Sequence, residues 1–122
     1  SDAAYKAASG VPVTMIAAPG ANKVIIVHRF LFQRDLVAAY DAAKTTNLYW
    51  SGALANPLTQ NISPGNNTGL RLHIVEPTAT MTNLTGSYLN EPVVFKTAAD
   101  STTGTGTNIQ RVWIAYSTVD MA

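Results

Sequence analysis

The chain contains no cysteine among its 122 residues. Disulfide bonds and thiolate metal sites are therefore excluded. Long apolar runs are also missing, since no stretch reaches the roughly 18 residues that a transmembrane helix needs. A chain of this length buries roughly two-thirds of the surface of its unfolded form. We therefore expect one domain held together by its hydrophobic core, without covalent cross-links and without a membrane span.

Charge is scarce as well. Charged residues make up 12% of the chain, whereas about 25% is usual. The net charge is only +1, so no strong field attracts nucleic acid or anionic lipid, and neither is expected as a partner. Because protein interfaces are depleted in charge, the composition fits a chain covered by neighbours in an assembly. It also fits a weakly charged soluble β domain, and composition alone leaves both open.

Apolar runs alternate with turn-rich segments along the chain, and little of it favours helix. This pattern predicts an all-β fold, an antiparallel β-sandwich of jelly-roll type with about seven or eight strands, in a single domain over residues 11–122. A flexible N-terminal arm is expected over residues 1–10. The clearest strands are expected at 11–16, 23–32, 47–51, 70–75, 91–98 and 109–119, and the clearest loops at 17–22, 60–69 and 100–108.

The sequence alone does not decide the secondary structure of two segments. Residues 33–44 combine alanines with Leu36 and Tyr40 at helical spacing, which fits either a helical turn or a long loop. Residues 53–58 follow the aromatic strand at 47–51 and are a candidate to pair with it.

The most apolar run, residues 23–32 (KVIIVHRFLF), carries His28 and Arg29 side by side. Its β-branched residues and apolar faces predict a central strand packed on both sides. Successive side chains of a regular strand point to opposite faces. His28 and Arg29 are therefore expected to point apart and not to form a catalytic pair. We expect a hydrogen-bonded core or interface position for His28 and a subunit contact for Arg29.

Two later strands show clear alternation. In the first, Leu70, Leu72 and Ile74 share one face, opposite Arg71, His73 and Val75. In the second, the odd-numbered residues from Ile109 to Ser117 share one face and the even-numbered residues from Gln110 to Thr118 share the other.

No set of residues indicates catalysis. The seven acidic residues lie in loops, at termini or at strand ends. The two histidines, His28 and His73, fall on different strands, which makes a shared metal site less plausible than a chance pairing. No serine lies in a G-x-S-x-G motif, and Gly104-Thr-Gly106 lies between two strands, where it indicates a hairpin loop rather than a dinucleotide site. The chain is therefore expected to be no enzyme and to hold no cofactor or metal.

Several segments together resemble a family of small virion proteins of tailed bacteriophages. The most specific are the A-P-G-A-x-K motif followed by apolar residues, at 18–27, and R-V-x-x-x-Y at 111–116. Further matching segments lie at 39–41, 47–50, 90–95 and 103–107. The resemblance covers roughly residues 11 to 120, and its motifs are strand and turn signatures that carry no catalytic residues.

The resemblance implies a capsid decoration or cement protein that bridges subunits of the major capsid protein, commonly as a homotrimer. Its place would be the capsid surface of the virion, after assembly in the host cytoplasm. The alternative is a phage tail or receptor-binding component whose aromatic residues bind carbohydrate. The candidate subunit or capsid contacts are Tyr5, Lys6, Arg29, Trp50, Asn66 and Asn67.

Overall fold

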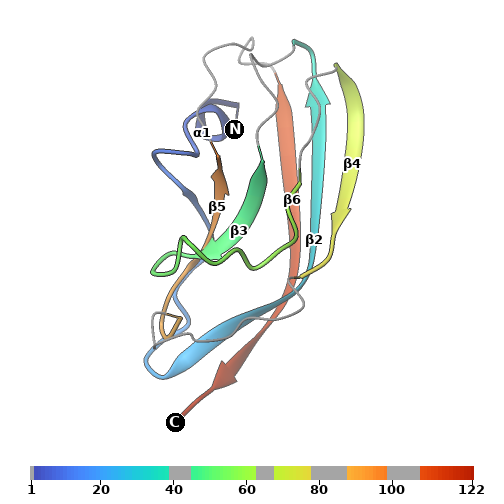
Figure 1. Ribbon diagram of the computed structural model, residues 1–122. Helices are drawn as coiled ribbons and strands as arrows, with labels where there is room; N and C mark the ends of the chain where they lie inside the picture. Colours follow the sequence, from blue (N-terminus) through green and yellow to red (C-terminus); the bar gives the residue numbers. More distant parts are fainter. Residues whose placement is uncertain (1, 39–44, 63–67, 78–87, 99–107) are drawn as a thin grey trace.

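Two three-stranded antiparallel sheets make up the computed structural model, which describes residues 2–38, 45–62, 68–77, 88–98 and 108–122 (Figure 1). The strand orders are β1-β5-β3 and β4-β2-β6. The elements are α1 (Asp2–Lys6), β1 (Val13–Ile16), β2 (Lys23–Leu36), β3 (Thr46–Trp50), β4 (Gly69–Val75), β5 (Val93–Thr97) and β6 (Ile109–Asp120). The expected all-β class with antiparallel strands is thus confirmed, with six strands in the described residues.

The inner faces of the two sheets meet in an aromatic core. Phe30 and Phe32 of β2 are fully buried, and their ring centroids lie 6.3 and 5.4 Å from that of Phe95 on β5. Each such side chain contributes about 1.5–3 kcal/mol by leaving water. Trp50 on β3 extends the core, and its indole N–H donates to the Ile25 carbonyl at 3.0 Å. These contacts hold the β2 strand against the opposite sheet.

The central strand is longer than predicted. β2 continues through Gln33 to Leu36, where it pairs with β4 on one side and β6 on the other. Both interpretations of this segment, helical turn and loop, are therefore wrong for residues 33–36, because hydrogen bonding on both edges outweighs a weak local helix propensity. Residues 39–44, which complete that segment, lie outside the described residues.

A β-bulge lies at His28 and changes the predicted directions of its neighbours. Ile26 pairs with Ser117 and Arg29 pairs with Ala115, with a register shift between Val27 and Arg29. The extra residue on β2 interrupts the alternation. His28 and Arg29 are both exposed, on the sheet face that carries the odd-numbered residues of β6. The expectation that they point to opposite faces is wrong, and so is a core position for His28.

The first ten residues, expected as a flexible arm, contain the short helix α1. Tyr5 of α1 is 5% exposed, and its ring lies 6.1 Å from that of Phe32 and 6.0 Å from that of Phe95. Ala8 is fully buried beside it in the same core. Removal of the segment expected as an arm would therefore strip two side chains from the core.

The predicted turn at 17–22 is confirmed. Gly20 and Asn22 both have positive φ values, 110° and 60°, and the Lys23 amide donates to the Gly20 carbonyl at 3.2 Å. The Asn90 side chain accepts a hydrogen bond from the Gly20 amide at 2.9 Å. Gly and Asn are the residues that adopt this backbone conformation most readily, which explains why the turn is visible in the sequence.

The segment after β3 adds to the edge of that strand. The Leu58 amide donates to the Leu48 carbonyl at 2.8 Å, and Thr46 and Ile62 exchange two backbone hydrogen bonds. This agrees with the expected pairing of residues 53–58 with the aromatic strand, through its last residue. Residues 63–67 of the loop expected at 60–69, and residues 100–107 of that expected at 100–108, lie outside the described residues. No helix in the described part of the chain has the length and apolar character to cross a bilayer.

Candidate functional site

Groups with catalytic or metal-binding potential do not converge in the described residues. No cluster of three or more His, Asp or Glu side chains that could hold a metal ion is present among them. The closest approach to a nucleophile–base pair is His28, whose Nε2 lies 2.8 Å from Ser117 Oγ. Both residues are exposed, and no described carboxylate orients the imidazole. The pair is a surface hydrogen bond across the bulge, and it lacks the third group that activates such a serine.

The second histidine, His73, lies on the inner side of β4, which is an edge strand of its sheet. His73 on β4 pairs with Phe32, and the two rings lie 6.1 Å apart. Burial lowers the pKa of His73, and the charges of Arg34 and Arg71 lower it further. The imidazole is therefore neutral at pH 7 and suits contact with apolar or neutral groups.

The predicted contact residues fall into three groups. Tyr5 and Trp50 are core side chains, 5% and 4% exposed, so the folded domain does not present them to a partner. Lys6 is half-buried in the last turn of α1, and Arg29 is exposed. Asn66 and Asn67 lie outside the described residues. The structure brings none of the described four together into one site.

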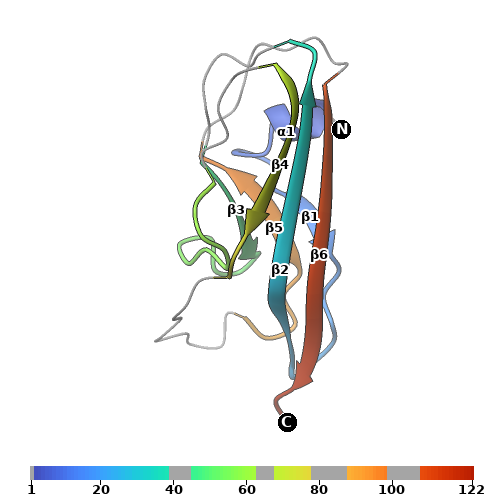
Figure 2. The ribbon, with the colours of Figure 1, turned by 90° about the vertical axis from the view of Figure 1, so that its right-hand side faces the viewer.

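The most prominent surface feature is the outer face of the sheet β4-β2-β6, which no described element covers (Figure 2). Five large apolar side chains on this face are between 43% and 66% exposed, namely Leu70, Leu72, Ile74, Ile109 and Trp113. The half-buried Leu31 lies between Ile74 and Trp113 in the register. We call these six residues the apolar face.

The polarity of β4 is inverted relative to an ordinary half-buried strand. Antiparallel strands with one solvated face place apolar residues inward and polar residues outward. In β4 the aliphatic residues Leu70, Leu72 and Ile74 point outward, while His73 is on the side of the buried Phe32. Exposure of apolar surface is unfavourable by about 25 cal/mol per Å². Exposed apolar patches of this kind are typical of interaction surfaces.

Charged residues of both signs border the apolar face. Asp35 and Gln33 lie on the same side of β2 as Leu31, and Arg111 pairs with Gln33 across the strands. Arg29 lies beside Ala115, beyond the row of Leu31 and Trp113. No ion pair joins these charges within the described residues, although Asp35 and Arg111 occupy neighbouring rows. They are therefore available to groups of a partner.

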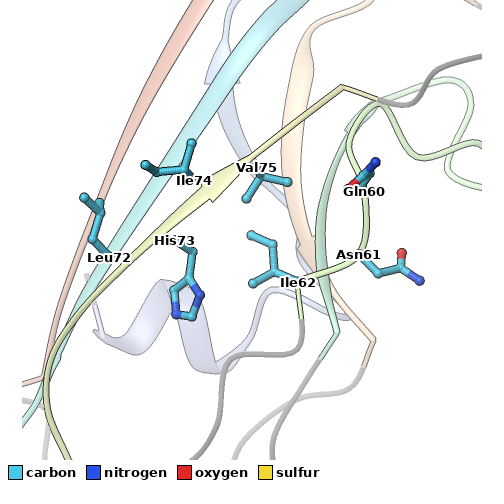
Figure 3. A pocket seen from close by; sticks show the side chains of 7 residues that line it. All are labelled: Gln60, Asn61, Ile62, Leu72, His73, Ile74 and Val75. Carbon is cyan, nitrogen blue, oxygen red and sulfur yellow. The ribbon is translucent and has the colours of Figure 1, made fainter.

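An open pocket of about 410 Å³ lies beside β4 (Figure 3). One wall is the β4 segment from Leu72 to Val75, and the other is the segment from Gln60 to Ile62. The Gln60 amide donates to the Glu76 carbonyl at 3.0 Å and joins the two walls at one end. Leu72 and Ile74 also line this pocket, but their side chains lie on the opposite side of β4 from those of His73 and Val75 (Figure 3). Amide groups, the His73 imidazole and aliphatic groups line it.

The sequence predicts which residues of β4 share the apolar face, but not whether that face is exposed or buried. The alternation in residues 70–75 separates the two faces of that strand correctly. No feature of the strand sequence shows which face is inward. The usual rule that apolar side chains point inward would have placed Leu70 and Leu72 in the core. The pocket had no signal at all, since its walls are separated by about ten residues and meet only in the fold.

Comparisons with protein-family models, with curated proteins and with solved structures found no match to this chain. Its function must therefore be argued from its residues and surfaces.

Proposed function

We propose that the protein is a structural virion protein of a tailed bacteriophage, most directly a capsid decoration or cement protein. In this proposal it is not an enzyme and needs no cofactor. It stabilises the shell by bridging subunits of the major capsid protein at the capsid surface, after assembly in the host cytoplasm. The jelly-roll type of the sandwich and the homotrimeric state belong to the same proposal and rest on the resemblance of the sequence motifs.

The observation that carries the proposal is the outward apolar side of β4. An isolated soluble domain gains nothing from presenting Leu70, Leu72 and Ile74 to water, whereas a subunit of a larger assembly buries them. The low fraction of charged residues, 12%, supports the same conclusion. A structural role also agrees with the absence of a converging acid, base or metal set in the described residues.

Attachment to a lattice explains how such a protein would act. Each copy contributes a modest contact energy, because association must offset the loss of translational and rotational freedom. Copies bound at many equivalent positions, each bridging several shell subunits, add these contacts into a large total effect. A rigid sandwich suits this role, since little ordering is needed when it binds.

The second candidate, a tail or receptor-binding component that recognises carbohydrate, depends on an exposed aromatic platform. Trp50 cannot supply it, because the ring is buried against Tyr88 with centroids 5.7 Å apart. Trp113 is 48% exposed beside Arg111 on the outer face of the sheet and is the one tryptophan able to stack on a sugar. Specific hits on a glycan array that disappear in Trp113→Ala would favour this candidate.

The deciding experiment uses purified capsids. Under the proposal, the protein sediments with isolated shells at a fixed copy number relative to the major capsid subunit, and addition of the purified protein raises the temperature at which bare shells disassemble. The protein sedimented without shells is the control. Absence from purified capsids, together with no effect on bare shells, would contradict the proposal.

A further inference from the structure

We propose that the outer face of the sheet β4-β2-β6 packs against the same face of a second copy of this chain. The contact is centred on Leu72, Ile74 and Trp113. This inference goes beyond the proposed function, and the contact between copies does not require capsid binding.

The size of the surface supports a protein partner. The five most exposed side chains of the apolar face together present on the order of 500 Å², near the upper end of the 300–600 Å² found for the largest apolar patch of a typical monomer. The polar neighbours Arg29, Gln33, Asp35 and Arg111 enlarge the face toward the roughly 800 Å² per partner that a stable interface buries. One sheet face therefore offers enough area for a specific complex.

The charges on the face favour a second copy over a partner of another kind. A face with charge of one sign needs a partner of the opposite sign. This face carries Asp35 and Arg111 one row apart, with Arg29 beyond, and neither Asp35 nor Arg111 has an ion-pair partner within the described residues. A symmetry-related copy presents the same two signs, so Asp35 of one copy can meet Arg111 of the next. Such self-complementarity is what a symmetric interface requires.

The edges of the sheet also leave room for a neighbouring copy. β4 and β6 are both edge strands, and neither contains lysine or proline, the residues that commonly protect an edge from pairing. β6 is 12 residues long and lies beside β2 alone in its sheet. Nothing in the described residues blocks a second sheet from approaching the apolar face or its edges.

The first test is the mass of the purified full chain in solution. Light scattering after size exclusion is expected to give two or three times the 12.9 kDa of one chain. Leu72→Lys places a charge in the centre of the contact and is expected to weaken association by about 30-fold or more, as for a central interface residue. Ile74→Lys should do the same, which guards against a folding defect particular to one variant.

Leu54→Lys is the matched control. Leu54 is also an exposed leucine, at 43%, but it lies in the turn after β3, away from the apolar face. This variant should retain the mass of the wild type. Circular dichroism and thermal unfolding of all three variants at low concentration should match, because each replaced side chain is exposed.

The second test exchanges the two charges. Asp35→Arg and Arg111→Asp alone are each expected to weaken association by about fivefold to tenfold, whereas the double variant should return to within about twofold of the wild type. A monomeric wild type at 200 µM would overturn the inference. So would an oligomer that survives both lysine variants. A monomeric wild type would also contradict the homotrimeric part of the proposed function, whereas binding to the shell is tested independently by the capsid experiment.

Discussion

The two faces of the sheet β4-β2-β6 differ in what their apolar residues do. On the inner face, Phe30 and Phe32 are fully buried and contact the opposite sheet through Phe95. On the outer face, side chains as apolar as these remain exposed. The inner face therefore supplies the stability of the single chain, while the outer face is the surface that we propose for association. A strand that is apolar on both sides can serve both purposes at once.

The largest expected difference between the faces comes from removing a side chain from each. Phe32→Ala should lower the free energy of unfolding by about 3–5 kcal/mol, because it leaves a cavity between the sheets. Leu72→Ala on the outer face should change it by less than about 0.5 kcal/mol. Urea unfolding at a concentration where the chain is monomeric measures both. Similar losses for the two variants would show that the outer face is part of the core of the monomer.

The buried Trp50 and the exposed Trp113 test the same difference between the core and the outer face. Trp50→Phe removes the indole donor of the Ile25 carbonyl and should cost about 1–3 kcal/mol, because that buried oxygen loses its partner. Trp113→Phe makes the same chemical change on the outer face and should alter stability by less than about 0.5 kcal/mol. Chemical denaturation monitored by far-ultraviolet circular dichroism compares them without relying on tryptophan fluorescence. Equal effects would contradict the assignment of Trp50 to the core.

The smallest expected effect is the contribution of His73, on the inner face, to the pH dependence of stability. The folded pKa of His73 lies below its ordinary value, which is about 6.5 in an unfolded chain. As the pH falls below 6.5, the unfolded state takes up a proton that the folded state resists, so stability present at neutral pH is lost. His73→Gln should reduce this loss between pH 7 and 5, as measured by the denaturation midpoint.

Asn61→Ala is the control for this effect, since Asn61 lines the same pocket but does not titrate. It should keep the pH dependence of the wild type. An unchanged slope in His73→Gln would mean that other groups produce the acid sensitivity.

Strand positions were largely predictable, and the errors follow from contacts between strands. The final strand was expected at 109–119 and runs from Ile109 to Asp120, because its alternation is regular and turn residues precede it. β2 was expected to end at Phe32 but continues to Leu36. Pairing with two neighbours extends it, and local propensity contains no information about those neighbours.

The bulge and the buried N-terminal helix could not be predicted from local sequence for the same reason. Both depend on contacts between segments that are distant along the chain. A bulge is a relation between two strands, here β2 and β6, and the almost continuous apolar run in β2 gives no sign of it. The small-residue segment at the N-terminus has too little apolar character to predict a fixed position. One side chain, Tyr5, finds a place between Phe32 and Phe95, and that place exists only when the sheets have come together.

The amino-acid sequence by itself determined where most strands and turns lie and, in strands without a bulge, which residues share a face. It also excluded cysteine chemistry. Only the tertiary structure decided which face is inside. Alternation is a local property with two equivalent sides, whereas burial depends on the strands that lie opposite. In β4 this choice left Leu70, Leu72 and Ile74 outside, since the pairing of His73 with Phe32 turns the other side of the strand toward the core.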